Sequence, residues 1–264
     1  MISNLISYFA AEELHITIAP EKLFQIGNIS ITNSMVYGWF CSLLIIGLLF
    51  IASRKMSVGG SRGPVQLIDA GVDFIINTVT NSLGSRKLAL KYTPIFAALF
   101  FFILLSNWLG LFPGVGHSIQ YDGTNFLRPF TADLNGTMAM ALFGMIIVQV
   151  IAIREIGPKN YAKHYFPGSF LNPATYLIGI FEIFSEFTRL ITLGLRLFLN
   201  IAVGEILIAV FTHLAGIAGP IAGLPFTLLE IFVGILQAYI FVVLLVAYLS
   251  LAVSHSLEEA EETA

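Results

Sequence analysis

The sequence predicts an all-α, polytopic membrane protein with transmembrane helices, one interfacial amphipathic helix and a long, strongly tilted, membrane-embedded helical hairpin. Composition is the first reason, since 57% of the 264 residues are hydrophobic and 11% are charged, against about 25% charged in a soluble domain. The second is that stretches without Asp, Glu, Lys or Arg recur at lengths that cross about 30 Å of hydrocarbon. These stretches are residues 36–52, 92–113, 134–153, 206–229 and 231–254.

The third observation is that basic residues are sorted between alternate loops. Residues 54–91 and 154–163 contain nine Lys and Arg, whereas the segments on the other side contain only Lys22 and Arg128. The positive-inside rule therefore predicts that the N-terminus lies outside and that residues 54–91 and the C-terminus are cytoplasmic. The expected location is the cell (inner or plasma) membrane, with an organellar inner membrane as the alternative.

The start of the chain does not resemble a cleaved signal peptide. It contains Glu12, Glu13 and His15 and lacks a basic segment followed by an apolar run. We therefore expect the first span to direct membrane insertion. The single cysteine, Cys41, lies in that span and is expected to pack as a small apolar residue.

We expect one membrane domain over residues 1–264. Gly and Pro mark the loops on either side of the third span, and Asp133 is a candidate N-cap for that span. The expected parts are an outside N-terminal segment (1–33), three spans (34–53, 90–112 and 134–153), an interfacial helix (64–84) and two hairpin helices (174–213 and 225–254).

Residues 65–83 have the pattern of an amphipathic helix, with apolar side chains on one face and polar side chains on the other. Pro64 and Gly84 mark its two ends. We expect this helix to lie at the membrane interface or against another subunit. Asp69 and Asp73 are interpreted as part of a solvated polar face, and the alternative is that they carry protons.

The first hairpin helix is too long to stand upright in a bilayer. No proline interrupts residues 174–213, and a helix of that length extends about 60 Å, twice the hydrocarbon thickness. Tilting is favoured over breaking, because an upright helix would spread Glu182 to Glu205 over about 35 Å of depth. A turn rich in Gly and Pro, residues 216–225, leads into the second helix.

Arg196 needs the most explanation, because no other charge lies between Arg189 and Glu205 in this apolar helix. A charge near the bilayer centre costs about 2.5 to 3.5 kcal/mol on insertion scales, so a functional role is the first hypothesis. Snorkelling of the arginine to the surface is the alternative. Glu182, Arg189 and Arg196 recur every seven residues and therefore share one helix face. Other polar residues of that face are Ser185, Thr192 and Asn200.

A second set of polar residues lies away from this face. Glu205 follows Arg196 by nine residues, which turns it to the opposite side of the helix. Glu230 and Gln237 share a face of the second hairpin helix. These placements predict two separate polar environments, which suit aqueous routes that reach the helix from different sides without joining. His213 extends the second route or caps the helix end.

Two motifs in the hairpin carry a resemblance to a known family. Residues 193–205, LGLRLFLNIAVGE, and residues 236–251, LQAYIFVVLLVAYLSL, resemble the a subunit of the F-type (rotary) ATP synthase membrane sector. The match extends along most of the chain. The resemblance implies that Arg196 is the essential stator arginine and that Asn200 lines the path beside it.

The resemblance also assigns roles to other polar residues. Glu205 and Glu230 are implied half-channel groups, and two adjacent carboxylates are able to share a proton. Leu199 and Leu190 stand where the family commonly has glycine and proline, and these differences affect local packing. The remaining implied roles are Gln237 as a neighbour of the arginine, Glu182 in the cytoplasm-facing exit path, His213 in the proton path, and Arg189 and Ser185 as secondary residues.

The implied function is that of the stator subunit of the ATP synthase proton channel. Two offset half-channels carry protons to and from rotor-ring carboxylates, and Arg196 prevents a direct proton leak, which couples translocation to rotation. The implied partners are the rotor c-ring, peripheral-stalk b subunits and the lipid bilayer. The sequence has no nucleotide-binding loop, so we expect ATP chemistry in partner subunits, and no enzyme activity, cofactor, metal or nucleic acid for this chain. The rotor site sets whether the coupling ion is a proton or sodium.

Two other classes of function compete with this interpretation. A secondary transporter uses broken helices and a buried arginine to bind an anionic substrate near the midplane, and inverted repeats are its signature. A structural membrane subunit uses its charges to lock neighbouring helices together. Neutral substitutions would then reduce assembly before they reduce transport.

Overall fold

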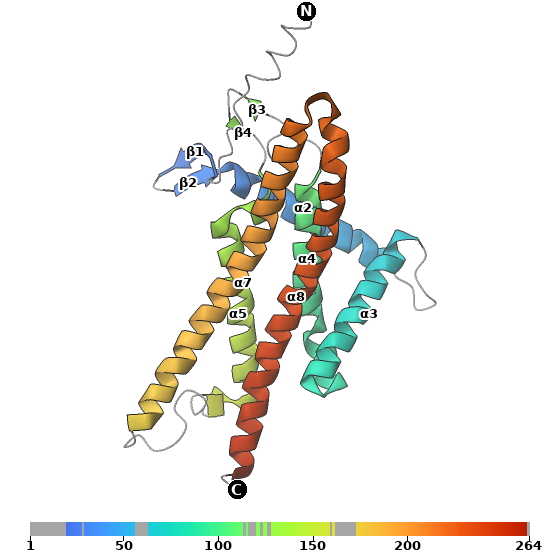
Figure 1. Ribbon diagram of the computed structural model, residues 1–264. Helices are drawn as coiled ribbons and strands as arrows, with labels where there is room; N and C mark the ends of the chain where they lie inside the picture. The colour runs from blue at the N-terminus through green and yellow to red at the C-terminus, as the bar shows by residue number, and fades with distance from the viewer. Residues whose placement is uncertain are drawn as a thin grey trace, which may run out of the picture. The chain divides into compact units, whose positions relative to one another are not determined.

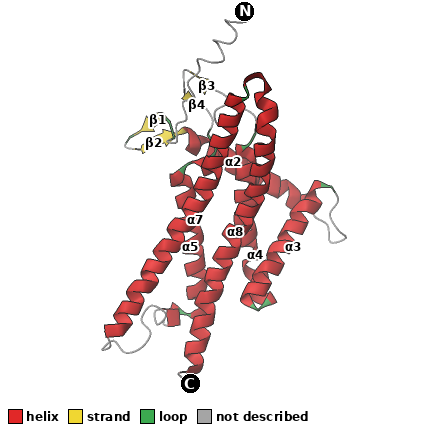
Figure 2. Cartoon of the chain, in the orientation of Figure 1, coloured by secondary structure: helices red, strands yellow, loops and turns green. Residues whose placement is uncertain are grey.

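The computed structural model describes residues 20–27, 29–55, 63–112, 115, 120–121, 124–125, 128–158, 160–161 and 173–262. Within these residues the chain is mainly helical, so the predicted all-α polytopic fold is confirmed (Figures 1 and 2). Five described helices are long and apolar enough to cross a membrane: α2, α4, α5, α7 and α8. The helices are α2 (Asn33–Lys55), α3 (Pro64–Leu83), α4 (Arg86–Gly110), α5 (Leu134–Ile156), α7 (Pro173–Leu214) and α8 (Gly219–Glu262).

The chain divides into two compact units. Unit 1 comprises Met1–Ser42, Leu104–Thr137 and Arg196–Leu236. Unit 2 comprises Leu43–Ile103, Met138–Leu195 and Gln237–Ala264. All five long helices therefore contribute residues to both units. Residues 1–19 of the expected outside segment and 162–172 of the expected loop after the third span lie outside the described residues.

Two small hairpins in unit 1 were not predicted from the sequence. They occupy segments that were expected to be an irregular N-terminal segment and a loop, where short runs of β-branched and aromatic residues favour pairing. The antiparallel pairs are β1 (Lys22–Ile26) with β2 (Ile29–Thr32), and β3 (Gln120–Tyr121) with β4 (Thr124–Asn125).

The start of α5 in unit 1 is capped by a buried aspartate. The Asn135 backbone N–H donates to Asp133 Oδ1 at 3.0 Å, which confirms the N-cap predicted from the sequence. Ser34 Oγ donates to Asp133 Oδ2 at 2.5 Å, so the same carboxylate also binds the first turn of α2. The Tyr37 hydroxyl donates to the carbonyl oxygen of Leu109 at 2.7 Å and joins α2 to the end of α4.

Phe130 fills the space between the helices of unit 1. A Cβ atom at Gly38 would lie 2.7 Å from the Phe130 ring, and one at Gly136 would lie 2.8 Å from it. Glycine at these two positions therefore lets the ring pack against both helix backbones. Cys41, on the same helix as Gly38, is almost fully buried, as expected of a small apolar side chain.

In unit 2, α3 packs against helices of its own chain. Ile75 and Val79 are fully buried, and a Cβ at Gly71 would lie 2.8 Å from Phe101 of α4. Ser250 of α8 donates to a carbonyl oxygen in the last turn of α3 at 2.7 Å. From the sequence, the apolar face of this helix was expected to contact the membrane interface or another subunit. In the structure, α4 and α8 cover part of that face.

Glycines also bring the long helices of unit 2 close together. A Cβ at Gly144 of α5 would lie 2.9 Å from Leu245 of α8. A Cβ at Gly194 of α7 would overlap the Met138 side chain of α5. Small residues allow this close approach between membrane helices, where van der Waals packing replaces the hydrophobic effect. At the end of α5, Glu155 accepts a hydrogen bond from Lys91 at 2.6 Å.

The helices α7 and α8 pack antiparallel and are joined by a short turn (Figure 1). In unit 1, Phe211 stacks on Phe226 with ring centroids 4.1 Å apart. In unit 2, the Arg189 guanidinium lies over the Tyr248 ring, 5.1 Å from its centroid. The first pairing joins the end of α7 to the beginning of α8, and the second joins interior positions of the two helices.

The turn of this hairpin is shorter than the sequence suggested. The turn was expected to last to residue 225, but only Gly216–Ala218 form a 3-10 turn, and α8 begins at Gly219. Pro220 is compatible with this start, because the first-turn N–H groups of a helix have no intrahelical partner. Pro225 lies inside α8 and removes one hydrogen-bond donor without ending the helix.

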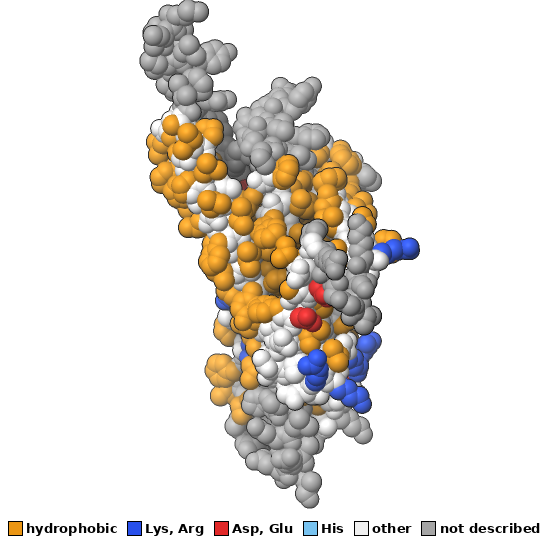
Figure 3. All heavy atoms as spheres, turned by 90° about the vertical axis from the view of Figure 1, so that its right-hand side faces the viewer, with side chains coloured by type: hydrophobic (Ala, Val, Ile, Leu, Met, Phe, Trp, Pro, Cys, Tyr) orange, Lys and Arg blue, Asp and Glu red, His pale blue; other side chains and the backbone are white. Residues whose placement is uncertain are grey.

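Apolar side chains cover much of the described surface in Figure 3, and several Lys and Arg side chains lie in the lower half of the view. Unit 2 contains the basic residues of the loop after α2 and the end of α5, whereas the loop with Arg128 belongs to unit 1. The alternation of basic loops in the sequence therefore corresponds to a division between the two units.

We predict that Asp133→Ala lowers the thermal stability of the detergent-purified protein, because the Asn135 N–H and the Ser34 hydroxyl both lose their acceptor. The expected loss is about 1 to 3 kcal/mol, measured as a fall in the denaturation midpoint. Asp133→Asn is the matched control, since asparagine keeps an oxygen that can cap the helix. Equal midpoints for Asp133→Ala and the parent would show that the cap is dispensable.

Candidate functional site

The polar residues predicted to be functional fall into two groups, one in each unit. The division on α7 lies between Leu195 and Arg196, and the division on α8 lies between Leu236 and Gln237. Unit 1 contains Arg196, Asn200, Glu205, His213 and Glu230, and unit 2 contains Glu182, Ser185, Arg189 and Gln237.

Arg196 lies on a half-open face of α7. Among the residues that the structure describes, no side chain forms an ion pair or hydrogen bond with its guanidinium. The neighbouring positions of the same face, Leu199 and Val203, are 51% and 49% exposed, and they lie within about 60° of Arg196 around the helix. The arginine is therefore presented on an uncovered apolar surface.

Glu230 is buried against the backbone of α7. Its side chain is 3% exposed, and a Cβ atom at Gly204 would overlap its carboxyl group. Only glycine leaves this space free. The antiparallel packing thus places Glu230 next to the residue that precedes Glu205, although the two glutamates are distant in the sequence.

Glu205, Glu230 and Arg128 form the charged part of a cluster in unit 1. Arg128, which is 6% exposed, acts electrostatically on Glu205, and Glu205 acts on Glu230. Arg128 is held by a hydrogen bond that it donates to the Ala132 carbonyl oxygen at 3.1 Å. The protonation of Glu205 therefore depends on Arg128, and the protonation of Glu230 depends on Glu205.

Uncharged polar side chains of α4 belong to the same unit. The Cβ of Asn107 would lie 3.4 Å from a Cβ at Gly234, one turn beyond Glu230 on α8. Trp108 donates its indole N–H to the carbonyl oxygen of Ile231 at 3.2 Å. Among the described residues, one oxygen each of Glu205 and Glu230 and the side-chain polar atoms of Asn107 and Ser106 are buried without a hydrogen-bond partner. Buried polar atoms of this kind commonly bind water.

His213 lies apart from this cluster. It is exposed and belongs to the last turn of α7. His213 therefore lies at the helix end. The two roles expected for it from the sequence were a cap at that end and a place in the proton path. Gln237, in contrast, is almost fully buried in unit 2.

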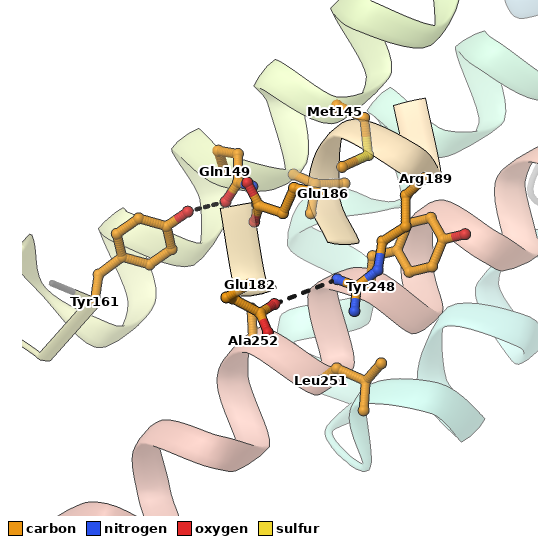
Figure 4. A pocket seen from close by; sticks show the side chains of 10 residues that line it. Met145, Gln149, Tyr161, Glu182, Glu186, Arg189, Tyr248, Leu251 and Ala252 are labelled. Atoms are coloured by element: carbon orange, nitrogen blue, oxygen red, sulfur yellow. Dashed lines mark hydrogen bonds and ion pairs between the residues drawn. The ribbon is translucent and has the colours of Figure 1, made fainter. Parts of the chain in front are cut away.

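Unit 2 contains a cavity of about 110 Å³ (Figure 4). Residues at intervals of three and four on α5, α7 and α8 form its wall, so each helix contributes one face. The lining residues are Met145, Val148, Gln149, Tyr161, Glu182, Glu186, Arg189, Tyr248, Leu251 and Ala252. This volume is large enough to hold several water molecules.

An ion pair joins two of the predicted site residues along the α7 wall of this cavity. Arg189 Nη1 lies 3.8 Å from Glu182 Oε1, and Figure 4 shows the two side chains directed toward each other. The guanidinium also contacts the Tyr248 ring of α8. The secondary residue Arg189 thus lies between a carboxylate and an aromatic ring. Ser185 is half-buried on the same helix and does not line the cavity.

Several residues of the unit 1 cluster and of the unit 2 cavity were not identified from the sequence. Glu186 lies beside the predicted polar face of α7, and Gln149 is the one polar side chain among residues 138–153 of α5, which is itself a signal of function in a membrane helix. Arg128 was counted only for topology. The space at Gly204 had no local signal, because it depends on the register between α7 and α8.

No group of three or more His, Cys, Asp or Glu in the described part of the chain is arranged to hold a metal ion. Its charged residues instead form pairs and small clusters with polar or aromatic side chains. The chemistry that this arrangement offers is proton exchange at carboxylates, in surroundings that also contain fixed cations.

Comparison with known families shows that residues 35–250 match the family described as ATP synthase A chain. The chain is 29% identical to ATP synthase subunit a of Moorella thermoacetica, over 88% of this chain and 96% of the relative. It is 31% identical to subunit a of Syntrophobacter fumaroxidans, over 92% and 93% of the two chains. Subunit a of Campylobacter concisus is 32% identical, over 90% and 99%. The similarity covers residues of both units.

We predict that Gly204→Ala is destabilising because the new methyl group occupies the position of the Glu230 carboxyl. Overpacking of this kind costs about 1 to 3 kcal/mol, which thermal denaturation of the purified protein measures. The same substitution in a Glu230→Ala background should cost little, since the obstructing group is absent. An equal penalty in both backgrounds would contradict the contact.

Proposed function

The chain belongs to the ATP synthase A chain family, and from this premise we propose that Arg196 separates and couples two offset half-channels for protons. As a member of this family it is a multi-pass membrane protein that acts as the stator of the proton channel. The proposed half-channels carry protons to and from the carboxylates of a rotor ring. The proposed partners of the chain are the rotor c-ring and the peripheral-stalk b subunits.

The observation that carries this proposal is the position of Arg196 on an uncovered apolar face. Among the described residues its guanidinium has no ion-pair partner, while Leu199 and Val203 beside it are about half exposed. A permanent charge is costly in hydrocarbon unless a counter-charge approaches it. A passing rotor carboxylate supplies that counter-charge.

The mechanism follows from the charge of the guanidinium. A bare carboxylate is too costly in lipid to be populated, so each rotor carboxyl group is protonated when it leaves the stator. Near Arg196 the ionised form is stabilised, and the proton is released to the outlet path. Because arginine does not deprotonate in proteins, it does not pass a proton directly between the two paths. Proton transfer across the membrane therefore requires rotation.

The two clusters supply the two paths. The inlet path is proposed to run through the unit 1 cluster, where Glu205 and Glu230 act on each other electrostatically. The outlet path is proposed to run through the unit 2 cavity, which Glu182 lines. Asn200 lies one helical turn after Arg196 and is proposed to line the inlet side, whereas Gln237 belongs to unit 2.

Membrane orientation is part of the same proposal. The loops with most Lys and Arg, residues 54–91 and 154–163, are assigned to the cytoplasmic side of the cell membrane, and the N-terminus is assigned to the outside. Since α7 has 42 residues, about twice the number that crosses a bilayer, α7 and α8 are inferred to run strongly tilted. Tilting keeps the charged groups within a narrow range of depth.

We predict that Arg196→Ala abolishes proton-driven ATP synthesis, with a loss of at least about a hundredfold. The reason is that the positive charge that stabilises the ionised rotor carboxylate is absent. Arg196→Lys should also fail to couple, since an ammonium group does not reproduce the planar guanidinium. The measurement is ATP synthesis in membrane vesicles that contain the whole complex.

Arg154→Ala is the matched control for Arg196→Ala. Arg154 is an exposed arginine in the last turn of α5 and lines neither cluster. We expect Arg154→Ala to retain ATP synthesis. The amount of assembled complex should be unchanged in Arg154→Ala, Arg196→Ala and Arg196→Lys. Full coupling in the Arg196→Ala enzyme would refute the proposed role of this residue.

Glu205→Gln is predicted to slow proton uptake more mildly than the arginine substitutions, by about tenfold or less, because one proton-exchanging group is lost while Glu230 remains. ATP-driven proton pumping in inverted vesicles measures the rate. Glu205→Asp keeps a carboxylate and should retain most of it. A parental pumping rate in Glu205→Gln would remove Glu205 from the path.

A further inference from the structure

Three side chains at the edge of the unit 2 cavity form a directed chain of hydrogen bonds. The Tyr161 hydroxyl donates to Oε1 of Gln149, and Gln149 Nε2 donates to Oε1 of Glu186 at 2.5 Å. Figure 4 shows Tyr161 pointing toward Gln149, with Glu186 on the other side of the amide. The chain connects the segment after α5, α5 itself and α7.

The carboxylate at the end of this chain is well placed to exchange protons. Glu186 lines the cavity one turn after Glu182 and three residues before Arg189. All three therefore lie on the same face of α7. A carboxylate beside water and a fixed cation can accept a proton and release it again.

We propose that Gln149, oriented by Tyr161, is a positioning residue that holds Glu186 for proton exchange in the outlet path. This inference rests on the proposed function, because it assigns a task to a cavity that the proposal makes the outlet. It adds three residues, Gln149, Glu186 and Tyr161, to the groups on which proton release depends, and Tyr161 lies outside the long helices.

The direction of the hydrogen bonds explains why a glutamine is needed. The amide of Gln149 has a donor end and an acceptor end, and the Tyr161 hydroxyl occupies the acceptor. The N–H is thereby directed at Glu186, where a hydrogen bond to a charged acceptor is stronger than one between neutral groups. If the amide turned over, its oxygen would face the carboxylate and repel it.

The proton balance of the step is simple. A proton that arrives from the rotor carboxylate binds the Glu186 carboxylate, whose Oε1 accepts the amide N–H. It then passes to water in the cavity, and the ionised carboxylate is restored. The other charged groups that line the cavity are Glu182 and Arg189 of α7, and Tyr248 is the titratable group contributed by α8.

The test compares ATP-driven proton pumping and proton-driven ATP synthesis in inverted vesicles that contain the whole complex. Gln149→Leu keeps a similar volume and removes the donor, so both rates should fall about tenfold, the effect of one lost hydrogen bond to a charged group. Tyr161→Phe should reduce them in the same direction but less. Gln149→His, which restores an N–H donor, should recover part of the rate.

A double-mutant cycle separates positioning from packing. If Gln149 acts through Glu186, then adding Gln149→Leu to Glu186→Gln should leave the rate of the Glu186→Gln enzyme unchanged. If the contact between Gln149 and Glu186 served only to pack α5 against α7, the rate reductions caused by the two substitutions would multiply. The amount of assembled complex would then also fall. Either of these results would overturn the proposal.

Two controls complete the experiment. Val150→Ala changes the neighbouring exposed position of α5 and should leave the rates unchanged. Arg196→Ala in the same vesicles tests the proposed function itself. If Arg196→Ala uncouples the enzyme while Gln149→Leu pumps protons as the parent does, only the inference about Gln149 fails. If Arg196→Ala remains coupled, the proposed function fails.

Discussion

A fixed positive charge in an apolar helix is the constraint on which the rest of this structure depends. Arg196 lies between two buried leucines of α7, Leu193 and Leu197, and the described residues give it no counter-charge. Such a charge is tolerated in a membrane only where something of opposite charge meets it. The polar groups on either side of it along α7 belong to different compact units, so Arg196 lies at the division between them.

The antiparallel packing of α7 and α8 converts distant positions in the sequence into chemical neighbours. The short turn at Gly216–Ala218 sets the register that brings the Glu230 carboxyl group onto Gly204. Glycine at that position is what makes room for a buried carboxyl group beside Glu205. Arg128, which belongs to a loop rather than to the hairpin, acts electrostatically on Glu205, and Glu205 in turn acts on Glu230. The unit 1 cluster thus depends on the register between α7 and α8 and on the absence of a side chain at Gly204.

The unit 2 cavity follows a different principle, in which three helices each contribute one face to a small polar space. Its charged groups are held by specific partners: Arg189 by Glu182 and the Tyr248 ring, and Glu186 by Gln149. In a low-dielectric environment these hydrogen bonds and ion pairs act more strongly than they would in water. The cavity therefore combines room for water with carboxylates of defined orientation, and both are needed for a proton to move along a fixed route.

The all-α membrane fold and the helix face that Glu182, Arg189 and Arg196 share were predictable from the sequence, because apolar content and helical spacing are properties of each segment. The essential role of Arg196 is a prediction of the same kind. The sequence placed the start of α8 too late, since proline is tolerated in the first turn of a helix. Only the tertiary structure showed which polar residues meet. The contact of Gly204 with Glu230 and the chain from Tyr161 to Glu186 depend on helix register and on close approach between backbones, which no local pattern encodes.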